Sequence, residues 1–167
     1  APEKLSELLR HQDHRVRQRA QFALAKSVGN RDLLIDATHP KNSLVTRLHG
    51  LWGLAQLARL QNDKDSQTLL KSLCSDQNWR IRGQAAQALG QTNPKPFRTT
   101  LSALLNDENL NTRMLSDIAL GKAVNPDDIP ALVSLVEKNT DPYLRHGAIY
   151  GLELIARSSD SADQIVA

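Results

Sequence analysis

The stretch Val16-Arg17-Gln18-Arg19-Ala20-Gln21-Phe22-Ala23-Leu24 contains a motif that recurs four more times along the chain. In each copy an apolar residue or Thr precedes an Arg, a small residue follows three positions later, and Ala or Gly then precedes Leu. The other copies occupy residues 46–54, 81–89, 112–120 and 144–152, and successive arginines are 30, 35, 31 and 32 residues apart. A repeat of this period indicates similar units that bury their apolar faces by stacking. The motif therefore predicts a stack of helical hairpins.

Each repeat contains two segments with apolar residues at helical spacing, separated by turn-forming residues. In the first repeat Leu5, Leu8 and Leu9 share one face, and Gly29-Asn30 is expected to cap the second helix. We expect an all-α, right-handed α-solenoid of about five hairpins, forming a single array over residues 1–157. The expected repeats are 1–29, 30–62, 63–92, 93–124 and 125–157. In the same order, their paired helices are expected at 4–11 and 15–28, 31–38 and 43–60, 66–74 and 79–91, 96–105 and 111–123, and 126–138 and 142–157. Residues 158–167 are expected to form a linker or to begin a further element.

The small residue of the motif has a physical reason, because two helices approach closely only where a side chain is nearly absent. These positions are Ala20, Gly50, Ala85, Ser116 and Ala148. Glycine inside a helix costs about 1 kcal/mol relative to Ala. The glycines within the expected second helices therefore indicate close packing or a contacted surface.

The recurring arginines of the motif are expected to form a structural ladder along the seam between repeats. An Asp precedes four of them by four or six positions, so that a turn carboxylate can reach the Arg of its own or the next repeat. The residues of this ladder are Arg17, Arg47, Arg82, Arg113 and Arg145, with Asp13, Asp76, Asp107 and Asp141. The alternative is a basic row that faces a ligand.

The motif with its turn Asp resembles HEAT repeats, and the period resembles the short bacterial type, which includes repeats named after phycobilisome lyases. Residues 8–60 also resemble the HEAT segment of large planctomycete-type proteins, through Leu8-Leu9-Arg10-His11 and Arg47-Leu48-His49-Gly50-Leu51-Trp52-Gly53-Leu54. In those proteins a dehydrogenase-like propeller precedes the repeats and a c-type cytochrome domain follows. This resemblance implies that any redox chemistry lies in flanking domains, and that the compartment is periplasmic or extracytoplasmic. Because the chain begins without Met, we expect it to be a fragment of a longer protein.

A row of large side chains is expected to point away from the hairpin core, two and six positions after the first residue of the motif. In HEAT arrays the second helices line the concave face, so the resemblance implies that this row contacts a partner protein or a neighbouring domain. Aromatic residues are favoured anchors at protein interfaces. The alternative is that packing within a longer array covers the row. Its candidate contact residues are Phe22, Leu48, Trp52, Met114, Ile118, His146 and Tyr150.

Composition and spacing argue against several other classes of site. The net charge is +3, with eleven Lys and Arg against six Asp and Glu in residues 1–64 and ten against twelve thereafter. No apolar run is long enough to span a membrane, the histidines lack metal-ligand spacing, and no cofactor motif is present. Cys74 follows Leu73 on an amphipathic segment, which favours a small buried residue over a nucleophile.

The leading hypothesis is thus a non-catalytic scaffold without metal or cofactor. Two alternatives stay open. One is a nucleic-acid-binding domain in which Arg15, Arg17, Arg19, Arg80 and Arg82 contact phosphates, although nucleic-acid binders usually carry a denser basic stripe. The other is a HEAT-like bilin lyase, for which the sequence specifies no bilin site.

Overall fold

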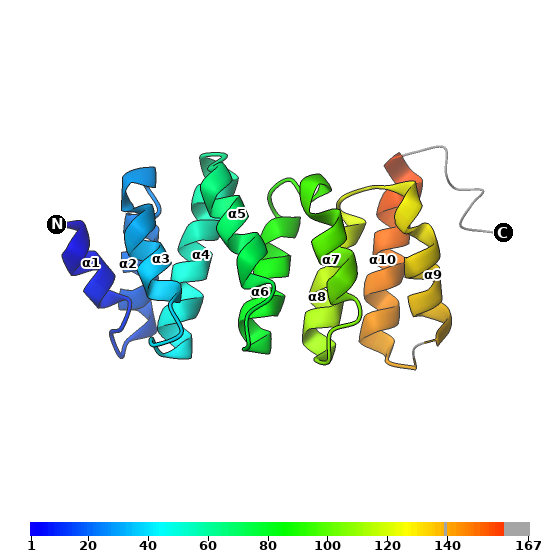
Figure 1. Ribbon diagram of the computed structural model, residues 1–167, viewed down its shortest axis with the longest axis horizontal. Coiled ribbons are helices and arrows are strands. Elements are labelled where there is room, and N and C mark those ends of the chain that lie inside the picture. The colour runs from blue at the N-terminus through cyan, green and yellow to red at the C-terminus, as the bar shows by residue number, and fades with distance from the viewer. Residues whose placement is uncertain (139, 159–167) are drawn as a thin grey trace. The chain divides into compact units, whose positions relative to one another are not determined.

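The computed structural model describes residues 1–138 and 140–158, where the chain forms ten α-helices, three short 3-10 helices and no strand (Figure 1). The all-α solenoid architecture expected from the repeats is confirmed. The α-helices are α1 (Pro2–Leu8), α2 (His14–Leu24), α3 (Arg31–Thr38), α4 (Leu44–Leu60), α5 (Lys64–Leu73), α6 (Trp79–Gly90), α7 (Arg98–Leu104), α8 (Leu110–Gly121), α9 (Ile129–Lys138) and α10 (Pro142–Ser158). The helix α10 thus includes Ser158, and the rest of the expected linker, residues 159–167, lies outside the described residues.

The chain divides into two compact units, one from Ala1 to Leu73 and one from Cys74 onward. In unit one α1 packs against α2, α3 against α4, and α4 against α5. In unit two α8 packs against α6, α7 and α10, and α9 packs against α10. The hairpin expected at residues 63–92 is divided between the units, since α5 belongs to the first and α6 to the second.

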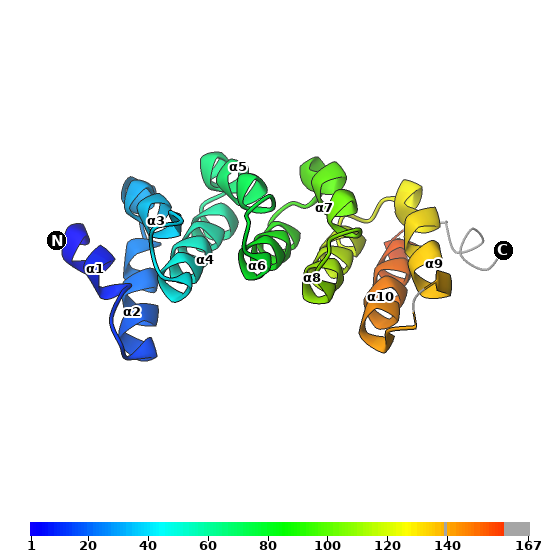
Figure 2. The same cartoon turned by 60° about the horizontal axis from the view of Figure 1, so that its bottom comes forward.

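Each unit has two layers of helices, which Figure 2 shows from a second direction. In unit one α3 and α5 lie in the layer of first helices, and α2 and α4 form the layer of second helices. In unit two α7 and α9 are first helices, and α6, α8 and α10 are second helices. The recurring motif lies on the second helices throughout, so their layer carries the candidate contact residues.

The turn residues position the second helices by capping them. The side chains of Asp13, Ser43, Asn78 and Asn109 each accept a hydrogen bond from a backbone N–H in the first turn of α2, α4, α6 and α8. Such caps satisfy N–H groups that have no partner within the helix. Asp, Ser and Asn residues therefore start these four second helices at the same phase of the motif.

Some expected boundaries are wrong where a 3-10 turn intervenes. The helix α2 ends at Leu24, and Gly29 and Asn30 lie in a 3-10 helix, Val28–Asn30, rather than forming a cap pair in sequence. Ser27 caps this turn, while the Asn30 side chain donates to the carbonyl oxygen of Leu24 at 3.0 Å. Short 3-10 helices at Lys95–Phe97 and Pro126–Asp128 likewise precede α7 and α9.

The small residues of the motif lie where helices approach most closely. Gly50 of α4 faces α3, and a Cβ atom placed there would lie 2.8 Å from the carbonyl oxygen of Leu34. Between α8 and α10, a Cβ atom at Gly121 would overlap the Cα atom of Gly151. Both contacts involve backbone atoms, which cannot move aside as a side chain does. The second helices of unit two are therefore held together by backbone contact.

One carboxyl group is buried in the same seam between α8 and α10. Asp117 is fully buried, and its two carboxylate oxygens have no hydrogen-bond partner among the described residues. Its side chain fills the space that a Cβ atom at Gly147 would need. Burial raises the pKa of Asp117 to about 7, because the charged form loses hydration without gaining a partner.

We expect Gly121→Ala to destabilise unit two by about 1–3 kcal/mol, because the added methyl group meets the backbone of α10. Gly83→Ala is the matched control, since its Cβ atom would lie 3.1 Å from a methyl group of Leu115, which can shift. The control should be neutral or more stable by up to about 1 kcal/mol, through helix propensity. Urea unfolding measures both variants, and equal stability of the two would contradict the close-contact interpretation.

We also expect unit two to lose stability as the pH rises from about 4 to about 7, because the folded state favours protonated Asp117 whereas the unfolded state does not. Asp117→Asn removes this charge with little change in shape. At pH 8 the variant should therefore be more stable than the parent by on the order of a few kcal/mol, and at pH 4 nearly equal to it. Thermal unfolding across this pH range measures the difference, and parallel profiles for the two proteins would refute the assignment.

Candidate partner-binding face

The second helices of unit one expose a stripe of apolar and basic side chains. On α2 and the turn after it, Arg15, Arg19, Phe22 and Lys26 follow one another at helical spacing, and all four are exposed. On α4 the corresponding stripe contains Val45, Leu48, Trp52 and Arg59. Phe22 and Val45 are each 45% exposed, while Leu48 and Trp52 are half-buried. We call these eight residues the unit-one face.

A buried polar cluster joins α2 and α4, the helices that carry the two aromatic residues of this face. His49 Nδ1 and Gln21 Oε1 lie 2.8 Å apart, and Arg17 Nε lies 3.2 Å from His49 Nε2. The His49 ring also meets Trp52 edge-on, with 5.2 Å between ring centroids. Since Phe22 directly follows Gln21, the cluster joins the helix turns that carry Phe22 and Trp52.

The partners of His49 determine its protonation and tautomer. The Arg17 guanidinium can only donate, so Nε2 of His49 must accept, and the ring proton therefore lies on Nδ1 and is donated to Gln21. Burial lowers the pKa of His49 to about 4, and the charge of Arg17 adds to this effect. His49 is therefore neutral near pH 7.

In unit two the candidate contact residues lie on α8 and α10. Met114 and Ile118 of α8 are half-buried, whereas His146 and Tyr150 of α10 are exposed. Tyr143 shares the stripe of Tyr150, two turns earlier on α10, and is 69% exposed. Sequence reasoning missed Tyr143, although its spacing of seven residues from Tyr150 places it on the same face.

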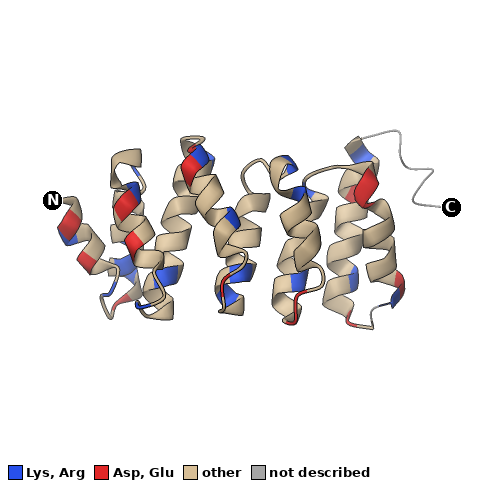
Figure 3. Cartoon of the chain, in the orientation of Figure 1, with Lys and Arg blue, Asp and Glu red and all other residues tan. Residues whose placement is uncertain are grey.

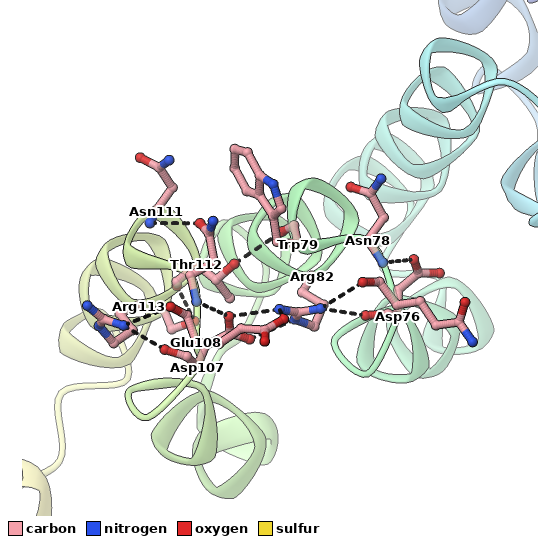
Figure 4. Close-up of polar contacts among 12 residues, drawn as sticks. Asp76, Asn78, Trp79, Arg82, Asp107, Glu108, Asn111, Thr112 and Arg113 are labelled. Carbon is pink, nitrogen blue, oxygen red and sulfur yellow. Dashed lines mark hydrogen bonds and ion pairs between the residues drawn. The ribbon is translucent and has the colours of Figure 1, made fainter.

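Arg82 connects neighbouring repeats in unit two, as Figure 4 shows. Its Nε and Nη2 atoms donate to the carboxylate of Asp107 at 2.7 and 2.9 Å, and Nη2 also donates to Glu108. Its Nη1 atom donates to the carbonyl oxygens of Asp76 and Gln77 at 2.9 and 3.1 Å. The hydrogen bond from Arg82 lowers the pKa of Asp107.

The other motif arginines mainly bind backbone carbonyl groups. Arg113 donates to the carbonyl oxygen of Asp107, and Arg17 to those of His11 and Gln12, each at 2.7 Å. Arg47 donates to the carbonyl oxygen of Thr38 at 2.8 Å, while Arg145 is exposed in the first turn of α10. In four of the five repeats, the motif Arg thus ties its helix to the preceding turn.

The turn aspartates act chiefly as caps. Asp13 accepts from the backbone and guanidinium of Arg15 rather than from Arg17. Asp76 and Asp141 accept from the backbone N–H groups of Asn78 and Tyr143. Asp107, in addition, pairs with the motif residue Arg82 of the preceding repeat.

Within residues 1–138 and 140–158, no three His, Cys, Asp or Glu side chains gather closely enough to hold a metal ion. Burial raises the pKa of the Cys74 thiol to about 12, so this thiol is protonated near neutral pH. None of the described helices has the length and apolar character needed to cross a membrane.

We expect unit one to lose stability as the pH falls from about 6.5 to about 4, since the folded state keeps His49 neutral while the unfolded state takes up a proton. The full loss should be on the order of 2–3 kcal/mol. NMR titration of the His49 ring measures the pKa directly, and His49→Gln should flatten the stability profile in this range. A pKa near 6.5 for His49 would show that the buried cluster does not form.

Comparison with known proteins places these features in a family. A family model described as HEAT repeats matches residues 2–90 and 66–153. No curated protein matches the sequence. A solved complex of CpcE and CpcF of phycocyanin lyase from Nostoc sp. PCC7120 is similar, with a TM-score of 0.70 and 18% identity, covering 95% of this chain and 66% of that chain. The chain thus spans just under two thirds of that protein.

Two engineered structures are also similar. A crystal structure of an engineered protein has a TM-score of 0.63 and 19% identity, covering 99% of this chain and 83% of its own. A designed armadillo repeat protein has a TM-score of 0.55 and 16% identity, covering 90% of this chain and 80% of its own. At such identities the likeness concerns the fold alone. Because the family model matches most of its length, the chain belongs to the HEAT repeat family.

Proposed function

We propose that this chain is a non-catalytic helical-repeat scaffold that holds a partner protein, or a neighbouring domain, through the exposed side of its second helices. The observation that carries the proposal is the unit-one face, where Phe22 and Val45 are exposed beside the half-buried Trp52. Exposure of such apolar side chains to water is unfavourable, whereas contiguous exposed apolar groups commonly mark a protein contact.

The support beneath this face favours docking of a folded partner or an ordered segment. Phe22 and Trp52 lie on helices that are joined by buried hydrogen bonds through Gln21 and His49. These two helices are therefore already joined when a partner arrives, which reduces the entropy lost on binding. His146, Tyr150, Met114 and Ile118 would supply a second contact surface on unit two.

The narrower resemblance of residues 8–60 extends the proposal to a particular setting. If the chain is a segment of a planctomycete-type multidomain protein, the partner would be a flanking domain of the same chain, in a periplasmic or extracytoplasmic compartment. Exposed aromatic side chains on a repeat segment are compatible with such a domain contact. Joining the adjacent domain to this segment should then protect the unit-one face from hydrogen exchange.

The nucleic-acid alternative is less well supported by the side chains that it requires. Arg17 and Arg82 bind turn carbonyl groups, Arg15 pairs with Asp13, and Arg80 lies 4.3 Å above the ring of Trp79. Four of its five candidate phosphate contacts are thus engaged within the protein. The bilin-lyase alternative rests on fold likeness alone, and the absorbance of added bilin tests it directly.

We expect Phe22→Ala/Trp52→Ala to abolish partner capture by unit one, and His146→Ala/Tyr150→Ala to weaken any contact made by unit two. Cross-linking of the immobilised chain in lysate of its source organism, followed by mass spectrometry, identifies the partner and compares the variants. The matched control is Val28→Ala/Leu60→Ala, which removes two exposed apolar side chains outside the face.

Each variant must first show parent-like helicity by circular dichroism. A partner that is captured equally by the parent and by both face variants would contradict the proposal. Loss of the partner in the control variant as well would point to non-specific apolar adhesion instead.

A further inference from the structure

The acidic residues in the helices of unit one are confined to the helices that lack the apolar stripe. The acidic residues of its helices, Glu3, Glu7, Asp32, Asp36 and Asp65, all lie on α1, α3 and α5, as Figure 3 shows. The second helices α2 and α4 contain no Asp or Glu, yet they carry Arg15, Arg17, Arg19, Arg47 and Arg59. The layer that bears the apolar stripe is therefore purely basic.

Only some of these cations are available to a partner. Arg17 and Arg47 turn toward backbone carbonyl groups, and Arg15 pairs with Asp13 at 2.8 Å. Arg19, Lys26 and Arg59 are exposed, and none of them has an ion pair or side-chain hydrogen bond with another described residue. These three are the unpaired cations of the unit-one face.

The unpaired cations flank the apolar side chains rather than forming a separate patch. Arg19 of α2 lies one turn before Phe22, and Lys26 follows Phe22 by four residues, in the turn after α2. On α4, Arg59 lies two turns after Trp52 on the same stripe. A complementary ligand needs apolar groups at its centre and negative charges on either side.

We propose that the unit-one face binds an acidic polypeptide segment, whose apolar side chains pack on Phe22, Leu48 and Trp52 while its carboxylates pair with Arg19, Lys26 and Arg59. This inference rests on the proposed function and adds the chemistry of the partner. Neither α2 nor α4 contains an acidic side chain that would repel the carboxylates of such a segment. Charge complementarity of this kind steers association and selects among partners.

A nucleic acid fits the same face less well. Strong binding to a phosphate backbone usually draws on many Lys and Arg contacts, whereas this face offers three unpaired cations. The same face carries Val45, Leu48 and Trp52, of which the two aliphatic side chains offer no stacking surface to a base.

A selection from a random dodecapeptide display library tests the inference on the full chain. Peptides are selected on the parent protein and counter-selected on Phe22→Ala/Trp52→Ala. We expect the surviving peptides to be enriched in Asp and Glu together with apolar residues. Face-dependent peptides without acidic enrichment would overturn the charge inference and leave the docking face standing. Absence of any face-dependent peptide would overturn binding of a polypeptide segment, and docking of a folded partner would then be decided by the cross-linking experiment.

Direct binding of a selected peptide then separates charge from apolar contact. Trp79→Phe leaves Trp52 as the single tryptophan, so its fluorescence reports on the face. Arg19→Gln/Lys26→Gln/Arg59→Gln should weaken binding about tenfold, as expected for three exposed ion pairs, and raised salt should weaken the parent in the same direction. Unchanged affinity in this triple variant would refute the role of the cations.

An oligo(dT) probe provides the competing measurement in the same assay. We expect it to bind more weakly than the selected acidic peptide at 150 mM salt, a condition chosen to be near physiological ionic strength. Tighter binding of oligo(dT), lost in Phe22→Ala/Trp52→Ala, would replace the acidic segment with single-stranded nucleic acid as the occupant.

Discussion

Close backbone approach between neighbouring helices is the constraint on which the rest of this structure depends. Gly50 meets the backbone of α3, and Gly121 meets that of α10, so that no side chain separates the helices there. Once one side of a second helix is committed to such contacts, its large residues can stand only on the remaining side. On α4, the partly exposed position of Trp52 is consistent with this packing.

Close packing between neighbouring helices also restricts which polar groups can be buried between them. A polar group is buried there only when it has hydrogen-bond partners or is neutral, since an unpaired buried charge is costly. Arg82 meets this condition through Asp107 and turn carbonyl groups, and His49 meets it by losing its proton. Asp117 meets it by keeping its proton, for want of a hydrogen-bond partner among the described residues. We therefore expect the two units to respond to pH in opposite directions, although both are built from helical hairpins.

The repeat period was sufficient to predict the all-α solenoid, the placement of the motif on the second helices and the burial of Ala20, Gly50 and Ala85. Boundaries at Gly29-Asn30 were wrong because a 3-10 turn differs from a helix end only in local hydrogen bonding. The carbonyl acceptors of Arg17 and Arg113 were missed because every residue has a carbonyl group, so they leave no mark on the sequence. The contact between Gln21 and His49 depends on the rotation between repeats, which periodicity alone does not specify.

The unit-one face and the buried contact between α2 and α4 depend on each other, because residues of the face adjoin residues of the contact. Gln21 binds His49 inside the seam, and the next residue along the chain presents Phe22 to the outside. His49 itself contacts Trp52. Protonation of His49 would place a positive charge beside the guanidinium of Arg17 and break the hydrogen bond that the neutral ring accepts. The arrangement of the unit-one face therefore depends on a histidine that stays neutral, and the buried contacts between α2 and α4 set the geometry of the proposed docking face.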